Sequence, residues 1–170
     1  MGVNIKTRAY GGRLIGAAII SVLTFSSVGY GEKPVRDYYK NGQLAAEKFY
    51  EKGRLKGPVR EYYVNGKPKS ELLYENGRRE GLFRTYYEDG QVKSEGFYKN
   101  GNLDRMFKEY YANGKSKSDL FYKDGKLEGH IREYYENGQL KAARFYRSGI
   151  EEKMPSEYDD KGDLKEVSGK

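Results

Sequence analysis

A repeat of 24 residues constrains this chain more than any other feature of its sequence. In each repeat a Tyr-Tyr pair is followed by Asn-Gly or Asp-Gly, and no insertion or deletion breaks the phase. The pairs are Tyr38-Tyr39, Tyr62-Tyr63, Tyr86-Tyr87, Tyr110-Tyr111 and Tyr134-Tyr135, and the glycines that follow them are Gly42, Gly66, Gly90, Gly114 and Gly138. Such a period is typical of stacked supersecondary units. It predicts five full repeats over 35–154, followed by a partial, polar capping repeat and tail over 155–170.

Each repeat predicts two strands and two tight turns. Residues 59–63 (VREYY) combine β-branched and aromatic residues, as strands do, and residues 67–74 run back after Asn65-Gly66. Both turn residues tolerate positive φ, so we predict a two-residue hairpin turn there and a second one at Asn76-Gly77. The chain is therefore expected to be all-β, an elongated single-layer antiparallel sheet of tandem hairpins.

A two-residue turn fixes a register in which opposite charges meet. It places Arg36 opposite Glu47, Arg60 opposite Glu71, Arg84 opposite Glu95 and Lys108 opposite Asp119, while Arg132 faces Ala143. The first Tyr of each pair and Phe49, with their equivalents, then share the face of these ion pairs. The second Tyr of each pair and Tyr50, with their equivalents, share the other face with Val35 and Leu44. Lys69, Lys93, Lys117 and Lys141 are expected on the face away from this ladder of ten Tyr.

The candidate partner-binding residues are the second tyrosines: Tyr39, Tyr63, Tyr87, Tyr111 and Tyr135. A Tyr can bury its ring and keep its hydroxyl in water, so this row could be a binding surface, the core of a thin sheet, or both. The turn glycines given above are expected to be structural.

The amino-acid composition limits the kinds of catalytic and metal sites that the chain can form. The chain has no Cys and one His, with 36% hydrophobic and 34% charged residues. Disulfides and thiolate sites are excluded. His130 stands where other repeats hold Pro58, Leu82, Met106 and Met154, which does not fit a catalytic position. We therefore expect no enzyme, no catalytic residue, no metal site and no cofactor. The net charge is +7, but beyond the leader the basic residues alternate with acidic ones, which argues against nucleic acid as a partner.

The first 29 residues resemble a targeting segment. They include Lys6, Arg8 and Arg13 and no acidic residue, and residues 14–31 carry no charge. This pattern predicts a signal peptide cut near Gly29, or an uncleaved N-terminal membrane anchor helix; a buried helix of the domain is a third reading. Residues 30–34 would be a linker. Either targeting reading places the repeats outside the cytoplasm, as a periplasmic, secreted or membrane-anchored protein.

The motif resembles the MORN repeat in its bacterial variant form. The resemblance is clearest at 86–101 (YYEDGQVKSEGFYKNG) and 110–125 (YYANGKSKSDLFYKDG) and extends over about 35–165. It implies an elongated sheet of successive hairpins used for binding rather than chemistry. Eukaryotic relatives are linked to membrane attachment and protein scaffolding, and bacterial variants often carry an antitoxin label.

Three functions follow from these observations. The first is an exported, non-enzymatic scaffold that binds a protein or peptide, with a glycan or a membrane surface as other ligands. The second is an envelope-associated spacer whose repeats only set length. The third is an antitoxin-like component of a toxin–antitoxin pair.

Overall fold

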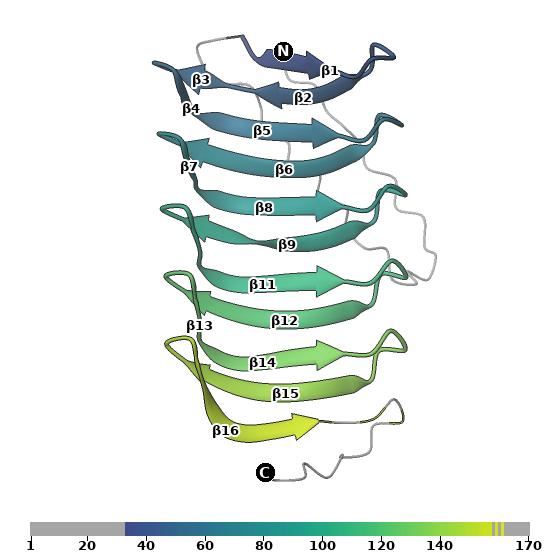
Figure 1. The fold of residues 1–170 in the computed structure, drawn as a ribbon, viewed down its shortest axis with the longest axis vertical. Coiled ribbons are helices and arrows are strands. Elements are labelled where there is room, and N and C mark those ends of the chain that lie inside the picture. The colour runs from purple at the N-terminus through teal and green to yellow at the C-terminus, as the bar shows by residue number, and fades with distance from the viewer. Residues whose placement is uncertain (1–32, 158, 160, 162–170) are drawn as a thin grey trace, which may run out of the picture.

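The computed structural model describes residues 33–157, 159 and 161. This part of the chain consists of strands and turns and contains no helix, as the sequence predicts. The strands stack along one long axis in an elongated sheet that does not close on itself (Figure 1). The leader, with its expected helix and export signal, lies outside the described residues.

Eleven strands follow one another across the main antiparallel sheet. They are β1 (Val35–Tyr38), β2 (Leu44–Lys48), β5 (Gly57–Tyr62), β6 (Pro68–Glu75), β8 (Gly81–Tyr86), β9 (Val92–Lys99), β11 (Arg105–Tyr110), β12 (Ser116–Lys123), β14 (Gly129–Tyr134), β15 (Leu140–Arg147) and β16 (Ile150–Glu157). Three two-residue strands pair with the ends of β6, β9 and β12: β7 (Arg78–Arg79), β10 (Asn102–Leu103) and β13 (Lys126–Leu127). A separate two-stranded sheet joins β3 (Tyr50–Glu51) and β4 (Arg54–Leu55). A repeat is thus one long hairpin followed by one short hairpin.

The turn of each long hairpin has three residues, so the predicted two-residue turn is wrong there. In the third repeat, the Tyr87 amide donates to the carbonyl of Gln91 at 2.8 Å, and the Gly90 amide donates to the carbonyl of Tyr87 at 2.9 Å. Gly90 has a φ of 97°, whereas Asp89 is not among the residues with positive φ. This is a three-residue hairpin loop that ends in a left-handed glycine. The Asp89 carboxylate instead accepts the amide of Gln91 at 2.9 Å, which explains the preference for Asn or Asp at this position.

A β-bulge restores the predicted register beyond this loop. Tyr86 pairs with Val92, but Thr85 pairs with Ser94, so Lys93 is the extra residue. The longer loop and the bulge compensate for each other, and the ion-pair positions face each other as predicted. The observed pairs are Arg36 with Glu47, Arg60 with Glu71, Arg84 with Glu95, Lys108 with Asp119 and Arg132 with Ala143.

The short hairpins have the two-residue turns that the sequence predicts. Both turn residues have positive φ, for example 50° at Asn76 and 80° at Gly77, as a type I′ turn requires. The Gly77 amide also donates to the carbonyl of Leu55 in the preceding repeat at 2.8 Å. The equivalent bonds of Gly101, Gly125 and Gly149 show that every short turn after the first helps to hold successive repeats together.

The core is thin and lies mainly on one side of the sheet. We call the side that carries the Arg84–Glu95 pair and its equivalents the ion-pair face, and the opposite side the tyrosine face. By strand alternation, the most buried apolar side chains of the central repeats belong to the tyrosine face, with Phe83 6% and Ile131 4% exposed. Buried Ser94 lies among them. Gly96 is required here, because a Cβ would lie 2.9 Å from Cε1 of Phe83.

Candidate functional site

The predicted tyrosine row connects successive repeats through its hydroxyl groups. The hydroxyls of the first four tyrosines each donate to a backbone carbonyl at the end of the first strand of the next repeat. The bonds run from Tyr39 to Tyr62 (2.6 Å), and from Tyr63 to Tyr86, Tyr87 to Tyr110 and Tyr111 to Tyr134 (2.7 Å each). These four tyrosines, and Tyr135 in the fifth repeat, are half-buried. The structure therefore gives this row a structural role and leaves part of each ring exposed.

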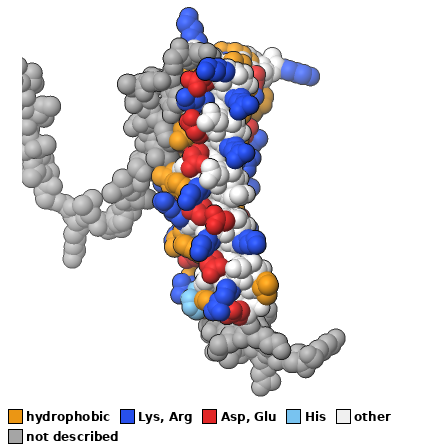
Figure 2. Space-filling model, turned by 90° about the vertical axis from the view of Figure 1, so that its left-hand side faces the viewer, with side chains coloured by type: hydrophobic (Ala, Val, Ile, Leu, Met, Phe, Trp, Pro, Cys, Tyr) orange, Lys and Arg blue, Asp and Glu red, His pale blue; other side chains and the backbone are white. Residues whose placement is uncertain are grey.

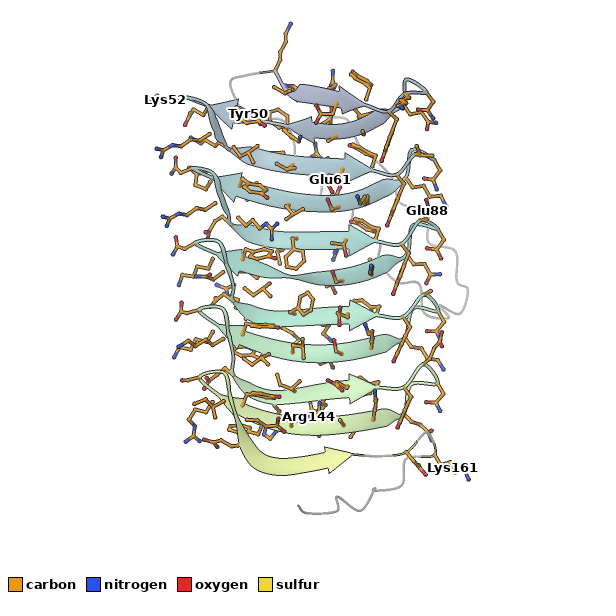
Figure 3. The ribbon with its side chains drawn as sticks, in the orientation of Figure 1. Tyr50, Lys52, Glu61, Glu88, Arg144 and Lys161 are labelled. Atoms are coloured by element: carbon orange, nitrogen blue, oxygen red, sulfur yellow. The ribbon has the colours of Figure 1, made fainter. Side chains whose placement is uncertain are left out.

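Tyr50 and its equivalents form a second set of tyrosines on the tyrosine face. They lie near the short hairpins, where Figure 3 labels Tyr50. The Tyr98 ring packs on Phe83 with centroids 4.8 Å apart, and the Tyr122 ring meets Phe107 edge-on at 6.2 Å. The ladder of ten Tyr is thus divided into two rows, one near the long-hairpin turns and one near the short hairpins. Phe83 and Phe107, stacked 6.0 Å apart, lie between these rows.

The lysine stripe lies on the tyrosine face, so its predicted placement on the opposite face is wrong. The bulge turns Lys93 toward Tyr87, and its Nζ lies 5.6 Å from the centroid of that ring. Lys141 lies 5.9 Å from the ring of Tyr135 in the same way. Leu44 is also misplaced by the predicted turn. It pairs directly with Tyr38, which puts both on the ion-pair face.

A polar hollow of about 310 Å³ accompanies this stripe in the fourth and fifth repeats. Its lining includes Tyr111, Glu109, Glu133, Lys117 and Lys141. Lys117 Nζ lies 3.7 Å from Glu109 Oε2, so part of the charge is paired. The hollow could hold a polar ligand between its acidic and basic side chains.

In the third, fourth and fifth repeats, the first tyrosine of the pair faces a carboxylate of the preceding repeat across the ion-pair face. The Tyr86 hydroxyl donates to Glu71 at 3.1 Å, and the Tyr110 hydroxyl donates to Glu95 at 2.8 Å. Burial, with the negative charge of Glu71 and this hydrogen bond, raises the pKa of Tyr86 to about 12. Burial first, and then the hydrogen bond and charge of Glu95, raises the pKa of Tyr110. Both tyrosines are therefore neutral donors at physiological pH.

An exposed apolar row crosses the ion-pair face beside these charged pairs. Leu82 is 53% exposed, Met106 50% and Phe121 40%. Leu82 pairs with Phe97, Met106 pairs with Phe121, and His130 pairs with Phe145, so each pair shares one face of the sheet. Seen from the short-hairpin edge, hydrophobic side chains recur along one side of the array among charged ones (Figure 2). Large exposed apolar side chains gathered on one face are typical of interaction surfaces.

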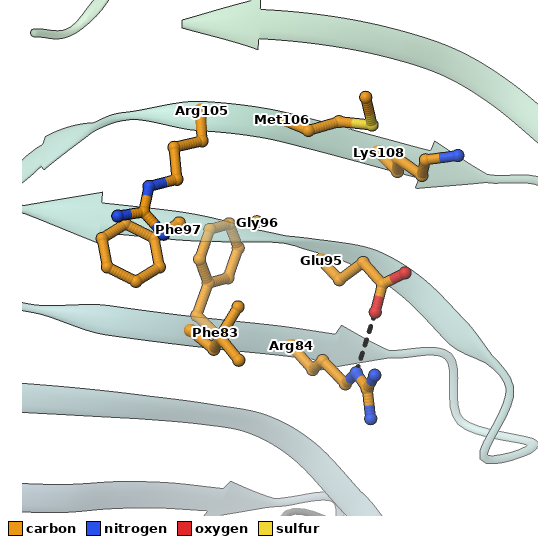
Figure 4. A pocket seen from close by; sticks show the side chains of 9 residues that line it. Phe83, Arg84, Glu95, Gly96, Phe97, Arg105, Met106 and Lys108 are labelled. Carbon is orange, nitrogen blue, oxygen red and sulfur yellow. Dashed lines mark hydrogen bonds and ion pairs between the residues drawn. The ribbon is translucent and has the colours of Figure 1, made fainter. Parts of the chain in front are cut away.

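This apolar row contains a pocket of about 280 Å³ (Figure 4). Leu82, Phe97 and Met106 provide apolar walls, and Arg84, Glu95, Arg105 and Lys108 also line it. The Arg105 guanidinium lies over the Phe97 ring, 4.4 Å from its centroid. Arg84 pairs with Glu95 at 2.9 Å and Lys108 with Asp119 at 3.4 Å. Arg105 lies 3.8 Å from Asp104 but has a side chain that is 68% exposed, so it is placed to meet a negatively charged group of an apolar ligand.

Arg105 has a backbone conformation that an arginine rarely adopts. Its φ is 67°, and the equivalent residues Gly57, Gly81 and Gly129 have φ values of 102°, 84° and 77°. A side chain in the left-handed region costs about 1–2 kcal/mol. The third and fourth repeats meet here, and this strain brings a cation to the rim of the pocket.

Sequence reasoning missed this apolar surface. The variety of residues at the positions of Leu82, Met106 and His130 argues only against catalysis. The available signal was that most of the residues at this repeat position are apolar and that Phe recurs across the hairpin, at Phe97, Phe121 and Phe145. The ring of His130 itself packs edge-on against Phe145 with centroids 4.9 Å apart.

The part of the chain that the structure describes has no group of three or more His, Asp or Glu placed to hold a metal ion. Among the same residues, no helix has the length and apolar character needed to cross a membrane.

Comparison with known proteins identifies the repeats. The profile described as "MORN repeat variant" matches residues 32–52, 55–76, 79–100, 106–124 and 127–149. A search of curated proteins gave no match. Among solved structures, a mutant of S. aureus TarM in complex with fondaparinux, alpha-GlcNAc-glycerol and UDP is similar, with 10% identity and a TM-score of 0.37 over 71% of this chain and 21% of that chain. A second TarM crystal structure has 13% identity and a TM-score of 0.37 over 62% of this chain and 20% of that chain. The chain thus spans about a fifth of the length of these two proteins.

Proposed function

Because the chain belongs to the MORN repeat variant family, we propose that it is a non-enzymatic scaffold that binds a partner protein on the ion-pair face after export from the cytoplasm. The observation that carries this proposal is the exposure of Leu82, Met106 and Phe121 on one face of neighbouring repeats. Large apolar side chains in water do not contribute to hydrophobic stabilisation. Their concentration on one face of the sheet therefore supports an interaction surface.

The partner surface that fits is apolar with acidic groups at its margin. Leu82, Phe97 and Met106 would contact its apolar side chains. Arg105, the more exposed cation at the same pocket, would pair with its carboxylates. The partially exposed ion pair between Arg84 and Glu95, 2.9 Å apart, would form part of the polar rim.

Export rests on the leader alone. Its basic start and the uncharged run over 14–31 support a signal peptide or an anchor, and both lead to a non-cytoplasmic site. If the leader is a cleaved signal, intact-mass measurement and cell fractionation should find a mature chain that begins near Tyr30 outside the cytoplasm. Full-length soluble protein in the cytoplasm would refute export and favour the antitoxin-like alternative.

Binding is tested by capture with surface variants matched in exposure. Met106→Ser and Phe121→Ser remove apolar contacts from the ion-pair face. Val64→Ser is the control, because Val64 is 52% exposed and lies beside a long-hairpin turn away from the pocket. We expect one saturable partner that the first two variants lose and the control retains, with unchanged melting temperatures. Equal capture by all three variants would contradict this surface, and no saturable partner would favour the spacer.

The hollow beside Tyr111 supports a second candidate, a polar ligand such as a glycan on the tyrosine face. Lys117→Gln and Lys141→Gln change its charge without removing the tyrosine hydroxyl bonds. If this candidate is right, these variants should lose ligand while Met106→Ser retains it. The opposite pattern would leave the ion-pair face as the binding surface.

A further inference from the structure

Among the described residues, no strand pairs with the outer side of the first strand, β1, which leaves one edge of this sheet open. It pairs with β2 on one side and is the first strand of the sheet, and all four of its residues are exposed. The equivalent strand of the third repeat, β8, is paired on both sides, with β9 and, through Thr85 and Arg84, with Ser70 and Glu71 of β6. At the top of Figure 1, β1 thus presents half of an interface that the array forms between its repeats.

The complete interface shows which chemistry this half recognises. Across the junction, a tyrosine hydroxyl of the later repeat bonds to a carboxylate of the earlier one. The three bonds are from Tyr86 to Glu71 (3.1 Å), from Tyr110 to Glu95 (2.8 Å) and from Tyr134 to Asp119 (3.3 Å). Glu71 also pairs in register with Arg84 of the later repeat. The receiving strand therefore offers a hydroxyl and a cation to an incoming carboxylate.

The first repeat presents the same groups to solvent. Tyr38 is 60% exposed, whereas Tyr86 and Tyr110 are half-buried. The Arg36 side chain, on the same face, is 50% exposed, although its Nε contacts Glu47 at 2.8 Å. We propose that β1 binds an extended acidic segment of a partner protein by strand addition. Its main chain would extend the sheet at Arg36 and Asp37, and its carboxylate would meet Tyr38 and Arg36.

The pattern of charges disfavours a second copy at this edge. Two β1 strands related by a two-fold axis at either central residue of the strand would place Arg36 opposite Arg36 or Asp37 opposite Asp37. Like charges directly opposite each other destabilise a strand pair. A suitable foreign strand has a carboxylate followed two residues later by an apolar side chain on the same face, as Glu71 and Leu73 are arranged in β6.

The probe is a labelled peptide with the sequence of residues 68–75 (PKSELLYE), titrated into the full chain and followed by fluorescence anisotropy. We expect saturable binding that weakens about tenfold when Lys replaces the residue equivalent to Glu71, because a hydrogen bond to a charged group is lost. Tyr38→Phe, which removes only an exposed hydroxyl, should weaken binding of the acidic peptide by a similar factor and leave the melting temperature unchanged.

Two further measurements locate the site. Lys126→Glu changes charge at an exposed position of β13, far from β1, and should bind the peptide as the wild type does. Hydrogen exchange should show peptide-dependent protection at the Arg36 amide, because alternate amides of a strand point to opposite sides and the Tyr39 amide points into its own hairpin. No binding, equal binding of the Lys-substituted peptide, or protection elsewhere would overturn the proposal. The result is independent of the apolar row around Leu82 and Met106, since Met106→Ser should not affect this peptide.

Discussion

The hydroxyl of Tyr87 donates a 2.7 Å hydrogen bond to the backbone carbonyl of Tyr110, which lies 23 residues further along the chain. The same bond links each of the first four repeats to the next. It uses the second Tyr of one pair as donor and the first Tyr of the next pair as acceptor. The Tyr-Tyr motif is therefore a junction between repeats, in which one ring serves each face of the sheet.

Removing these hydroxyls should destabilise the array. We expect Tyr87→Phe with Tyr111→Phe to lower the free energy of unfolding by about 0.5–1.5 kcal/mol per bond, because each backbone carbonyl loses its donor. Urea denaturation measures the change. Tyr38→Phe is the control, since Tyr38 is 60% exposed. An unchanged midpoint in the double variant would show that water replaces the hydroxyl without cost.

Charge reversal at Arg84 and Glu95 tests the register. The two side chains are 2.9 Å apart and partly exposed, so Arg84→Glu or Glu95→Arg alone should cost up to about 1 kcal/mol. Combining them should recover part of this loss. Recovery should be greater in a Tyr110→Phe background, because the Tyr110 hydroxyl also uses Glu95 at 2.8 Å. Strictly additive losses in denaturation experiments would contradict this pairing.

Gly96 should not tolerate a side chain beside its present neighbours. A Cβ would lie 2.9 Å from Cε1 of Phe83 and 3.1 Å from Cδ2 of Phe107. Gly96→Ala should therefore cost about 1–3 kcal/mol through overpacking. Adding Phe83→Val should reduce this cost, since the second repeat combines Val59 with Leu72 at the equivalent positions. The comparison is the change caused by Gly96→Ala in each background, measured by thermal unfolding.

Arg105→Gly should have opposite effects on stability and on partner binding, because it relieves backbone strain and removes a cation from the pocket. Glycine relieves the left-handed φ of 67° at a gain of about 1–2 kcal/mol, offset by about 0.5–1 kcal/mol for the lost stacking on Phe97. We expect stability equal to or slightly above that of the wild type. Partner capture should nevertheless weaken, because the pocket loses a cation. A clear drop in melting temperature would show that the Arg105 contacts outweigh the strain.

Alkaline pH should destabilise the array through its buried tyrosines. The pKa of Tyr86 is about 12 in the folded chain and near 10.0 when the chain is unfolded. The stabilising contribution is full below pH 10 and is lost as the pH rises toward 12, because the unfolded chain releases the proton first. Tyr86→Phe should therefore show a shallower decline in melting temperature between these pH values than Tyr38→Phe. Identical slopes would argue against this assignment.

The sequence alone determined the repeat, the strands, the short two-residue turns and the pairs of opposite charge. These features depend on short stretches of sequence, or on the regular alternation of side chains between the two faces of a strand. A period of 24 residues without insertions repeats them five times. The prediction that Tyr86 lies on the ion-pair face was right because this alternation continues along its strand. The register was right although the long-hairpin turn was wrong, because the extra loop residue is offset by the bulge at Lys93.

Tertiary structure decided which atoms meet between repeats. It placed Lys93 over the ring of Tyr87, bonded the tyrosine hydroxyls to carbonyls 23 residues away, and left Leu82 and Met106 exposed beside a pocket. A periodic sequence predicts which residues form strands and, for most residues, which face of the sheet their side chains occupy. It does not specify how a bulge redirects a side chain, or how closely one hairpin packs on the next. Those outcomes depend on three-dimensional packing between residues distant in the chain, where a shift of one residue in one strand moves a side chain to the opposite face.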